Sequence, residues 1–183
     1  FFAVTKVDSE NRDFYKTFDI LKNELGNKLC PVVVPYMNGP VCEAFVNLCS
    51  NKAYKYPNGR PVEIDIPSDA NIEAMRAALE EAVATVDDEL MEKFFEGEPL
   101  TKDEIIKGLT EGVLQGEIFP VYACSGYNLD GVDLLMDALV YSAPNPAYAR
   151  KETGTNENGD VVPVKCDANG ETIAICFKTV ADP

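Results

Sequence analysis

The chain has 183 residues, which is enough for one full domain or two small ones. Apolar residues make up 46% of it, and no apolar run reaches the roughly 18 residues that a membrane-spanning helix needs, so we expect a soluble protein that does not enter a membrane. The net charge of −15 opposes contact with phosphates, so we expect no direct nucleic acid binding. Because the chain contains no histidine, zinc sites that use histidine and Ser–His or Cys–His catalysis are excluded for these residues.

Six cysteines are spread along the chain without a Cys-x-x-Cys pair. A chain of this length can fold on an apolar core, so reduced and mostly buried thiols are favoured over three disulfides. Reduced thiols are typical of the cytoplasm, which is the location we predict. The sequence starts inside an apolar run, Phe1–Val4, with neither a methionine nor a signal peptide pattern, and we therefore expect an internal part of a longer protein.

The first predicted elements are a short strand and a helix. Phe1–Val4 is typical of a buried strand, and it ends at the tetrapeptide Thr5-Lys6-Val7-Asp8. Apolar residues at helical spacing predict a helix from Asp13 to Leu25, and Gly26 supplies its end. Four short runs separated by turn residues then predict a small antiparallel sheet. These runs are Cys30–Pro35, Val41–Leu48, Lys52–Tyr56 and Pro61–Ile66.

Three helices are predicted next. An apolar stripe that starts at Ile72 marks the first, acids in the first turn mark a second over Asp87–Glu96, and the capping box Thr101–Glu104 opens the third. The stretch Glu80–Glu104 contains ten carboxylates and two lysines. Such a stretch is either a solvated helix face or a docking surface for a basic partner, and composition alone leaves both open.

The last part of the chain returns to a strand and a helix and then changes character. Ile118–Ala123 predicts a strand, Cys124-Ser125-Gly126 a loop, and Gly131–Tyr141 a helix. Residues 151–160 are predicted as a polar linker, and Val161–Cys166 with Thr172–Lys178 as a hairpin. The chain is therefore predicted to be α/β, with two strand–helix units that belong together, an inserted α+β module between them, and the start of an all-β part.

Two loops follow the carboxyl ends of the flanking strands, where open α/β sheets bind ligands. An ionised Asp8 carries two acceptor oxygens, which match the adjacent ring N1–H and amino donors of guanine and not the edge of adenine. Lys6 can lay its aliphatic stem along the base, and the small residues Ser125 and Gly126 let backbone N–H groups approach the base carbonyl. A Thr-Lys-x-Asp tetrapeptide also occurs as a plain strand end before a helix, so the spacing alone leaves this alternative open.

Longer motifs resemble those of translational GTPases of the elongation factor G family. Thr5-Lys6-Val7-Asp8 resembles the guanine-reading Asn-Lys-x-Asp motif, and Ser125-Gly126 lies where the family has Ser-Ala. Residues 87–101 resemble the family stretch DDELMEKYLEGEELT, and residues 176–183 resemble AFKTMADP. Ala143-Pro144-Asn145-Pro146 resembles the boundary at the end of the GTPase domain. The resemblance extends over essentially the whole chain.

The resemblance implies part of a P-loop GTPase sheet, an inserted G′ subdomain and the first strands of a β-barrel domain. It places the second half of the GTPase domain at 1–28, the G′ insert at 29–116, the end of the GTPase domain at 117–148, and a linker with the start of domain II at 149–183. It implies GTP and GDP as ligands, with Mg²⁺ in the full-length parent and neither a catalytic nor a metal-binding residue in this chain. The base contacts it implies are Thr5, Lys6, Val7, Asp8, Ser125 and Gly126.

The resemblance also implies the ribosome as partner, and the ribosomal stalk protein as the partner of the acidic G′ helices, with candidates Glu80, Glu81, Asp87 and Asp88. Three departures from the family pattern are Thr5 in place of asparagine, the Cys124 loop, and residues 37–51. They favour a divergent member, so a ribosomal protection or release-type factor stays open beside a translocation factor, as does an acidic protein-binding module. No Gly-x4-Gly-Lys-Ser/Thr loop occurs, so we expect hydrolysis by the parent protein and not by this chain alone.

Overall fold

A computed structural model of the chain describes residues 1–9, 12–68, 72–145, 147, 152–170, 172–176 and 178–181. The chain divides into two units, Phe1–Ala143 and Pro144–Pro183. The first unit holds a mixed sheet with helices on both sides, so the predicted α/β class is confirmed for it. In the described residues no helix is long and apolar enough to cross a membrane. All six cysteines are free thiols, as expected.

One six-stranded sheet organises the first unit, in the order β1-β6-β2-β3-β4-β5. β1, β6 and β2 are parallel neighbours, and β3, β4 and β5 continue the sheet in antiparallel fashion. The expectation of a separate antiparallel sheet is therefore wrong in one respect, because β2 also joins the parallel strands. The strands are β1 (Phe2–Val4), β2 (Leu29–Asn38), β3 (Val41–Asn47), β4 (Lys52–Lys55), β5 (Val62–Ile64) and β6 (Phe119–Ala123).

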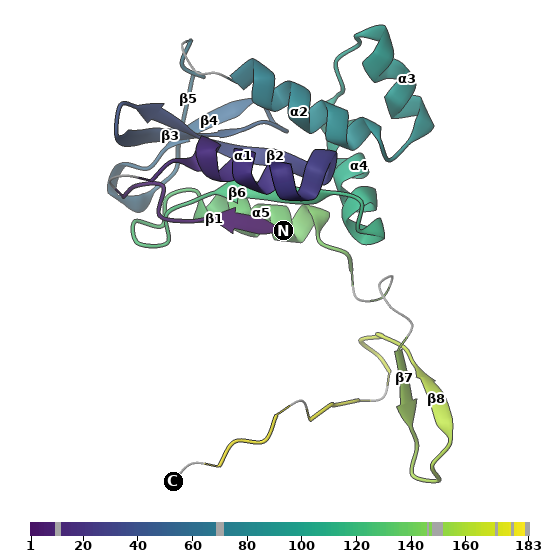
Figure 1. The fold of residues 1–183 in the computed structure, drawn as a ribbon. Coiled ribbons are helices and arrows are strands. Elements are labelled where there is room, and N and C mark those ends of the chain that lie inside the picture. The colour runs from purple at the N-terminus through teal and green to yellow at the C-terminus, as the bar shows by residue number, and fades with distance from the viewer. Residues whose placement is uncertain are drawn as a thin grey trace. The chain divides into compact units, whose positions relative to one another are not determined.

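The core of this unit is centred on β2. Its first seven residues, from Leu29 to Pro35, are all buried, which is typical of a strand covered on both faces. Figure 1 shows α1 (Phe14–Leu25) and α2 (Ile72–Ala84) on one side of the sheet and α5 (Val132–Ser142) on the other. Pro31 lacks an N–H, and the pairing of β2 with β6 shifts register between Pro31 and Val33.

The helices begin and end where local chemistry predicts. The Asp13 side chain accepts a hydrogen bond from the Lys16 N–H at 3.0 Å and caps α1, which Gly26 ends. Asp87 caps α3 (Asp88–Glu96) in the same way, and Thr101 with Glu104 forms the predicted capping box of α4 (Lys102–Gln115).

The second unit contains a hairpin that differs from the predicted one. β7 (Glu152–Thr155) pairs with β8 (Val161–Val164), so residues 152–155 are a strand and not a linker. Among the described residues, 172–176 and 178 are not in a strand, so their predicted role as the partner of Val161–Cys166 is wrong. The cause is local, because the Asn156 side chain accepts from the N–H groups of Asn158 and Asp160 and closes the turn between β7 and β8.

The Glu104 carboxylate joins α3 to α4, and it generates a pH-dependent prediction. Its ion pair with Lys93, followed by its hydrogen bonds with Thr101, lowers its pKa from 4.5 to about 2. A carboxyl group whose pKa is lowered by folding stabilises the protein fully above its unfolded pKa, and this contribution is lost as the pH falls toward the folded pKa. We expect Glu104→Gln to unfold at a lower urea concentration than wild type at neutral pH, with a difference that shrinks between about pH 5 and pH 3.

Urea titrations followed by circular dichroism at several pH values measure this difference. Glu92→Gln on α3 is the matched control, because Glu92 is exposed and the substitution removes the same charge. A Glu104→Gln difference that stays constant down to pH 3 would contradict the prediction.

Candidate functional site

The two loops predicted to act together begin at the same edge of the sheet. β1 and β6 run parallel with Phe2 opposite Val121 and Val4 opposite Ala123. Beyond the last pair, the Cys124 N–H donates to the Val4 carbonyl at 3.1 Å. The segments that follow β1 and β6 therefore leave the sheet side by side, at the carboxyl ends of the two strands.

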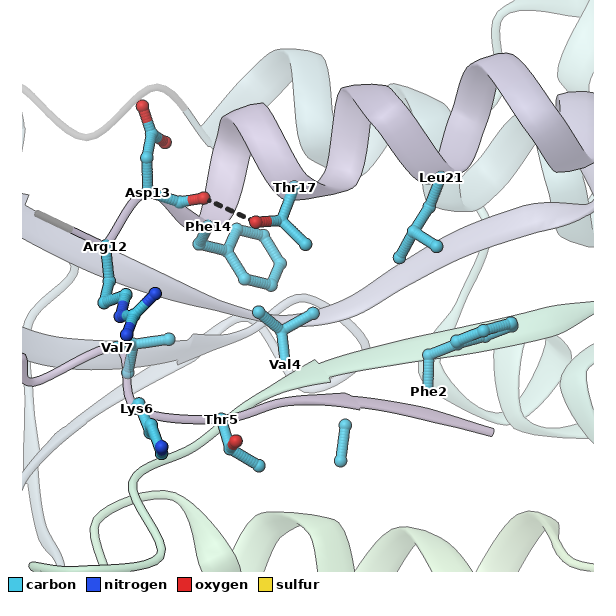
Figure 2. Close-up of a pocket in the computed structure, with 11 residues that line it drawn as sticks. Phe2, Val4, Thr5, Lys6, Val7, Arg12, Asp13, Phe14, Thr17 and Leu21 are labelled. Atoms are coloured by element: carbon cyan, nitrogen blue, oxygen red, sulfur yellow. Dashed lines mark hydrogen bonds between the residues drawn. The ribbon is translucent and has the colours of Figure 1, made fainter.

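The first loop is a tight turn around Lys6. Lys6 has a φ of 63°, which is uncommon for a residue with a side chain, and its carbonyl accepts from the Ser9 N–H at 3.1 Å. Thr5 and Lys6 are exposed, and Figure 2 shows their side chains pointing away from α1. Val7 is buried and anchors the turn, while Asp8 is half-buried.

The second loop is held by Ser125, which is fully buried. Its hydroxyl oxygen accepts from the Asn128 N–H at 3.1 Å, and its own N–H donates to the Asp130 carbonyl at 2.8 Å. Gly126 is exposed and has nothing within 4 Å of the position that a Cβ would take. The Ser125 side chain thus stabilises its own loop, and Gly126 leaves the backbone beside it open.

Asn128 connects the two loops. Its Nδ2 lies 3.5 Å from Oδ2 of Asp8, across 120 residues of sequence. The other oxygen of Asp8, Oδ1, is buried without a hydrogen-bond partner among the described residues. An acceptor without a partner is costly, by about 1–3 kcal/mol, so this oxygen is the group at the site most in need of a donor. The sequence pattern did not reveal Asn128, although its spacing from Ser125 is typical of a serine-closed turn.

Negative charge is concentrated where the loops meet. Burial raises the pKa of Asp130, and the nearby Asp8 carboxylate raises it further, while a hydrogen bond from the Asn128 side chain lowers it. Burial raises the pKa of the Cys42 thiol to about 12, with the charges of Asp130 and Asp8 adding to the effect. The surroundings of Asp8 therefore favour ligand groups that donate hydrogen bonds.

A cavity of about 460 Å³ lies between β1, the first loop around Lys6 and the start of α1. Figure 2 shows Phe14, Thr17 and Leu21 of α1 along one wall. Thr5, Lys6 and Val7 line it, but Asp8, Ser125 and Gly126 do not. The cavity therefore does not include the place where Asp8 meets the second loop. In the described part of the chain, no three of the residue types that bind metals come together.

The four acidic residues predicted to dock a partner differ in their surroundings. Glu80 pairs with Arg76 at 2.9 Å, and Glu81 accepts from Asn27 at 3.3 Å. Asp87 caps α3 through the Glu89 N–H at 2.8 Å and lies 3.4 Å from the Lys107 ammonium. Asp88 is exposed, and no hydrogen bond or ion pair of its side chain is found in the described ranges.

The chain was compared with known proteins, and no family model matches it. Elongation factor G of Ureaplasma parvum serovar 3 is 32% identical over 98% of the chain. The chain is similar to elongation factor G over nearly its whole length. Elongation factor G of Ureaplasma urealyticum serovar 10 is 31% identical over the same share. A crystal structure of a Thermus thermophilus protein superposes with a TM-score of 0.70 at 30% identity, over 79% of the chain and 22% of that protein.

The chain spans 27% of the length of the curated relatives that it matches. The comparisons confirm the resemblance inferred from the motifs, and the structural neighbour agrees with the α/β class.

Gly131, which precedes α5 beside the site, generates a stability prediction. Gly131 and Gly116 both have a φ of 74°, so alanine introduces similar backbone strain at both positions, about 1 kcal/mol. A Cβ on Gly131 would lie 3.0 Å from the Ala123 carbonyl and 3.0 Å from Phe45, whereas one on Gly116 meets nothing within 4 Å. We expect Gly131→Ala to lower the free energy of unfolding by about 1–2 kcal/mol more than Gly116→Ala. Urea denaturation measures both values, and equal losses would contradict the prediction.

Proposed function

We propose that this chain is the guanine-reading part of a translational GTPase of the elongation factor G family. The proposal rests on one observation beyond the sequence similarity. The carboxylate of Asp8 lies where two parallel strands deliver their loops, and it carries a buried acceptor oxygen with no partner in the described residues. Guanine offers two adjacent donors, and an ionised carboxylate is the matching acceptor.

The remaining site residues have distinct proposed roles. Lys6, exposed at the turn, lays its stem along the base plane and keeps its ammonium in water. The backbone at Ser125 and Gly126 donates to the base carbonyl, and Val7 fixes the loop in the core. Thr5 has a shorter side chain than the asparagine of the family motif, and we propose that it contributes less to binding.

The activity of the whole protein is proposed from its family. GTP hydrolysis, the Mg²⁺ that assists it and contact with the ribosome in the cytoplasm belong to the full-length parent, since no phosphate-binding loop occurs in these residues. We assign residues 1–28 and 117–148 to the GTPase domain, 29–116 to the G′ insert, and 149–183 to a linker and domain II. A ribosomal protection or release-type factor shares the same base site, so it remains the second candidate.

The base-reading role predicts a change of nucleotide preference in Asp8→Asn. The amide presents an N–H donor where the carboxylate presented an acceptor, which disfavours the guanine amino group and favours the 2-carbonyl of xanthine. In the full-length protein we expect GDP affinity to fall roughly 10- to 100-fold and xanthosine diphosphate affinity to rise. Competition titrations with the two nucleotides measure both changes.

Asp13→Asn is the control, because asparagine caps a helix as well as aspartate does and Asp13 lines the cavity on the other side of β1. Unchanged GDP affinity in Asp8→Asn would sink the proposed role of Asp8. A change of preference in Asp13→Asn instead would move the base into the cavity.

We further propose that the acidic helices dock the ribosomal stalk protein of the family. The carboxylates available for this are on α3, where Asp88, Glu89 and Glu92 are all exposed. Glu80, Glu81 and Asp87 already serve contacts within the chain, so they contribute less. Phe95 is 78% exposed on the same helix and adds an apolar contact within the acidic surface.

Docking through α3 predicts a position-dependent effect of charge reversal. We expect Asp88→Lys to weaken binding of the stalk protein C-terminal domain at least about threefold. Asp19→Lys on α1 changes the net charge equally and should leave affinity unchanged, because Asp19 is exposed on a different helix. Isothermal titration at two salt concentrations distinguishes the two variants. Equal weakening by both would mean that binding depends on net charge and not on α3.

A further inference from the structure

The side-chain amide of Asn128 lies between two carboxylates at the point where the loops meet. Its Nδ2 contacts Oδ2 of Asp8 at 3.5 Å. Burial and the Asp8 charge raise the pKa of Asp130, and the same side chain of Asn128 lowers it. Its own backbone N–H is bound to Ser125, so the side chain is presented from a fixed turn. Leu129, the next residue, has a φ of 65°, in the left-handed region, and therefore turns the backbone between Asn128 and Asp130.

Two carboxylates placed close together repel each other, and the repulsion is stronger where burial reduces screening by water. An asparagine amide has two N–H donors and no charge, so it can serve two acceptors without introducing a competing cation. A lysine at this position would neutralise the pair and reduce the negative potential around Asp8. The amide instead keeps the potential and restricts the orientation of the carboxylate.

We propose that Asn128 is a positioning residue for base recognition, holding Asp8 through one lone pair of Oδ2 so that Oδ1 and the other lone pair of Oδ2 stay available to the two guanine donors. This inference rests on the proposed function of Asp8. It assigns a role to a residue outside both motifs of the site. The amide donor of Asn128, rather than the size of the side chain or the geometry of its turn, sets the orientation of Asp8.

Other charged or titratable groups surround this pair, and their contributions differ. Asp133 on α5 adds negative charge near Asp130, but its carboxylate already accepts from the Tyr56 hydroxyl at 2.6 Å. The Cys42 thiol on β3 stays protonated, because burial and the same carboxylates raise its pKa to about 12. Asn128 is thus the group through which the charges of Asp8 and Asp130 are most directly coupled.

The test uses Asn128→Asp, which keeps the size and turn preference of the side chain and replaces the amide donor by an acceptor. The first measurement is a carboxyl ¹³C NMR titration of Asp130 in this 183-residue chain. Loss of the hydrogen bond that lowers the pKa of Asp130 is expected to raise that pKa in Asn128→Asp and also in Asn128→Ala. Backbone amide spectra verify that both variants keep the wild-type fold.

The second measurement is GDP affinity in the full-length protein. We expect Asn128→Ala to weaken GDP binding about fivefold. Asn128→Asp is expected to weaken it more, because the added carboxylate repels Asp8 as well as removing the donor. Asn27→Ala is the matched control. It removes another amide–carboxylate contact, from Asn27 to Glu81 at 3.3 Å, near the start of β2 and so at the opposite edge of the parallel strands.

The outcomes test the bridge, the positioning role and the function of Asp8 separately. An unchanged pKa of Asp130 in Asn128→Ala overturns the bridge between the carboxylates, because Asn128→Asp raises that pKa through its added charge alone. A raised pKa with unchanged GDP affinity overturns the positioning role. Wild-type protein that fails to discriminate GDP from ADP overturns the proposed function of Asp8, and with it the positioning role, while the NMR titration still decides whether the bridge exists.

Discussion

The parallel pairing of β1 with β6 is the constraint on which the candidate site depends. Only three residue pairs define it, yet they join segments that are more than 110 residues apart in the sequence. A shift by one residue would turn every side chain of β1 to the opposite face and would separate Val4 from the Cys124 N–H. Because Asp8 and Asn128 lie in the loops that follow these strand ends, the register helps to set which residues of the two loops meet.

The segment between β1 and β6 must therefore bring the chain back to the same edge. β2 does this by pairing with β6 in parallel and with β3 in antiparallel fashion, so the intervening strands extend the sheet that carries the site. The helices close around it at short distances. A Cβ on Gly108 would lie 2.5 Å from Val83, and one on Gly112 would lie 2.5 Å from Ile118. Glycine at both positions lets α4 approach its neighbours closely enough to return the chain to β6.

Local chemistry made the helices predictable, and non-local pairing limited the rest. The capping box at Thr101 starts α4 as predicted. The helix predicted to begin at Asp13 begins one residue later, because Asp13 is its capping residue. β2 pairs with its sequence neighbour β3, but its parallel partner β6 is more than 80 residues away. The unbroken apolar run of β2 is nevertheless typical of a parallel strand buried on both faces. The second hairpin was misplaced because the Asn156 turn lies inside a segment that composition marks as a linker. Asn128 belongs to no motif, so only the folded chain reveals its proximity to Asp8.

The departures from the family pattern at Thr5 and in the Cys124 loop lie in two loops that contact each other. Thr5 lacks the amide of the family motif, and the Ser125 hydroxyl is engaged by the Asn128 N–H. Within the described part of the chain, the side-chain amide that reaches Asp8 comes from Asn128, in the opposite loop. A site that has lost an amide in one loop thus has one available from the other, at a different angle to the carboxylate. Since Asp130 adds a second negative charge beside Asp8, this arrangement keeps the preference for donor groups while tying it to the geometry of the second loop.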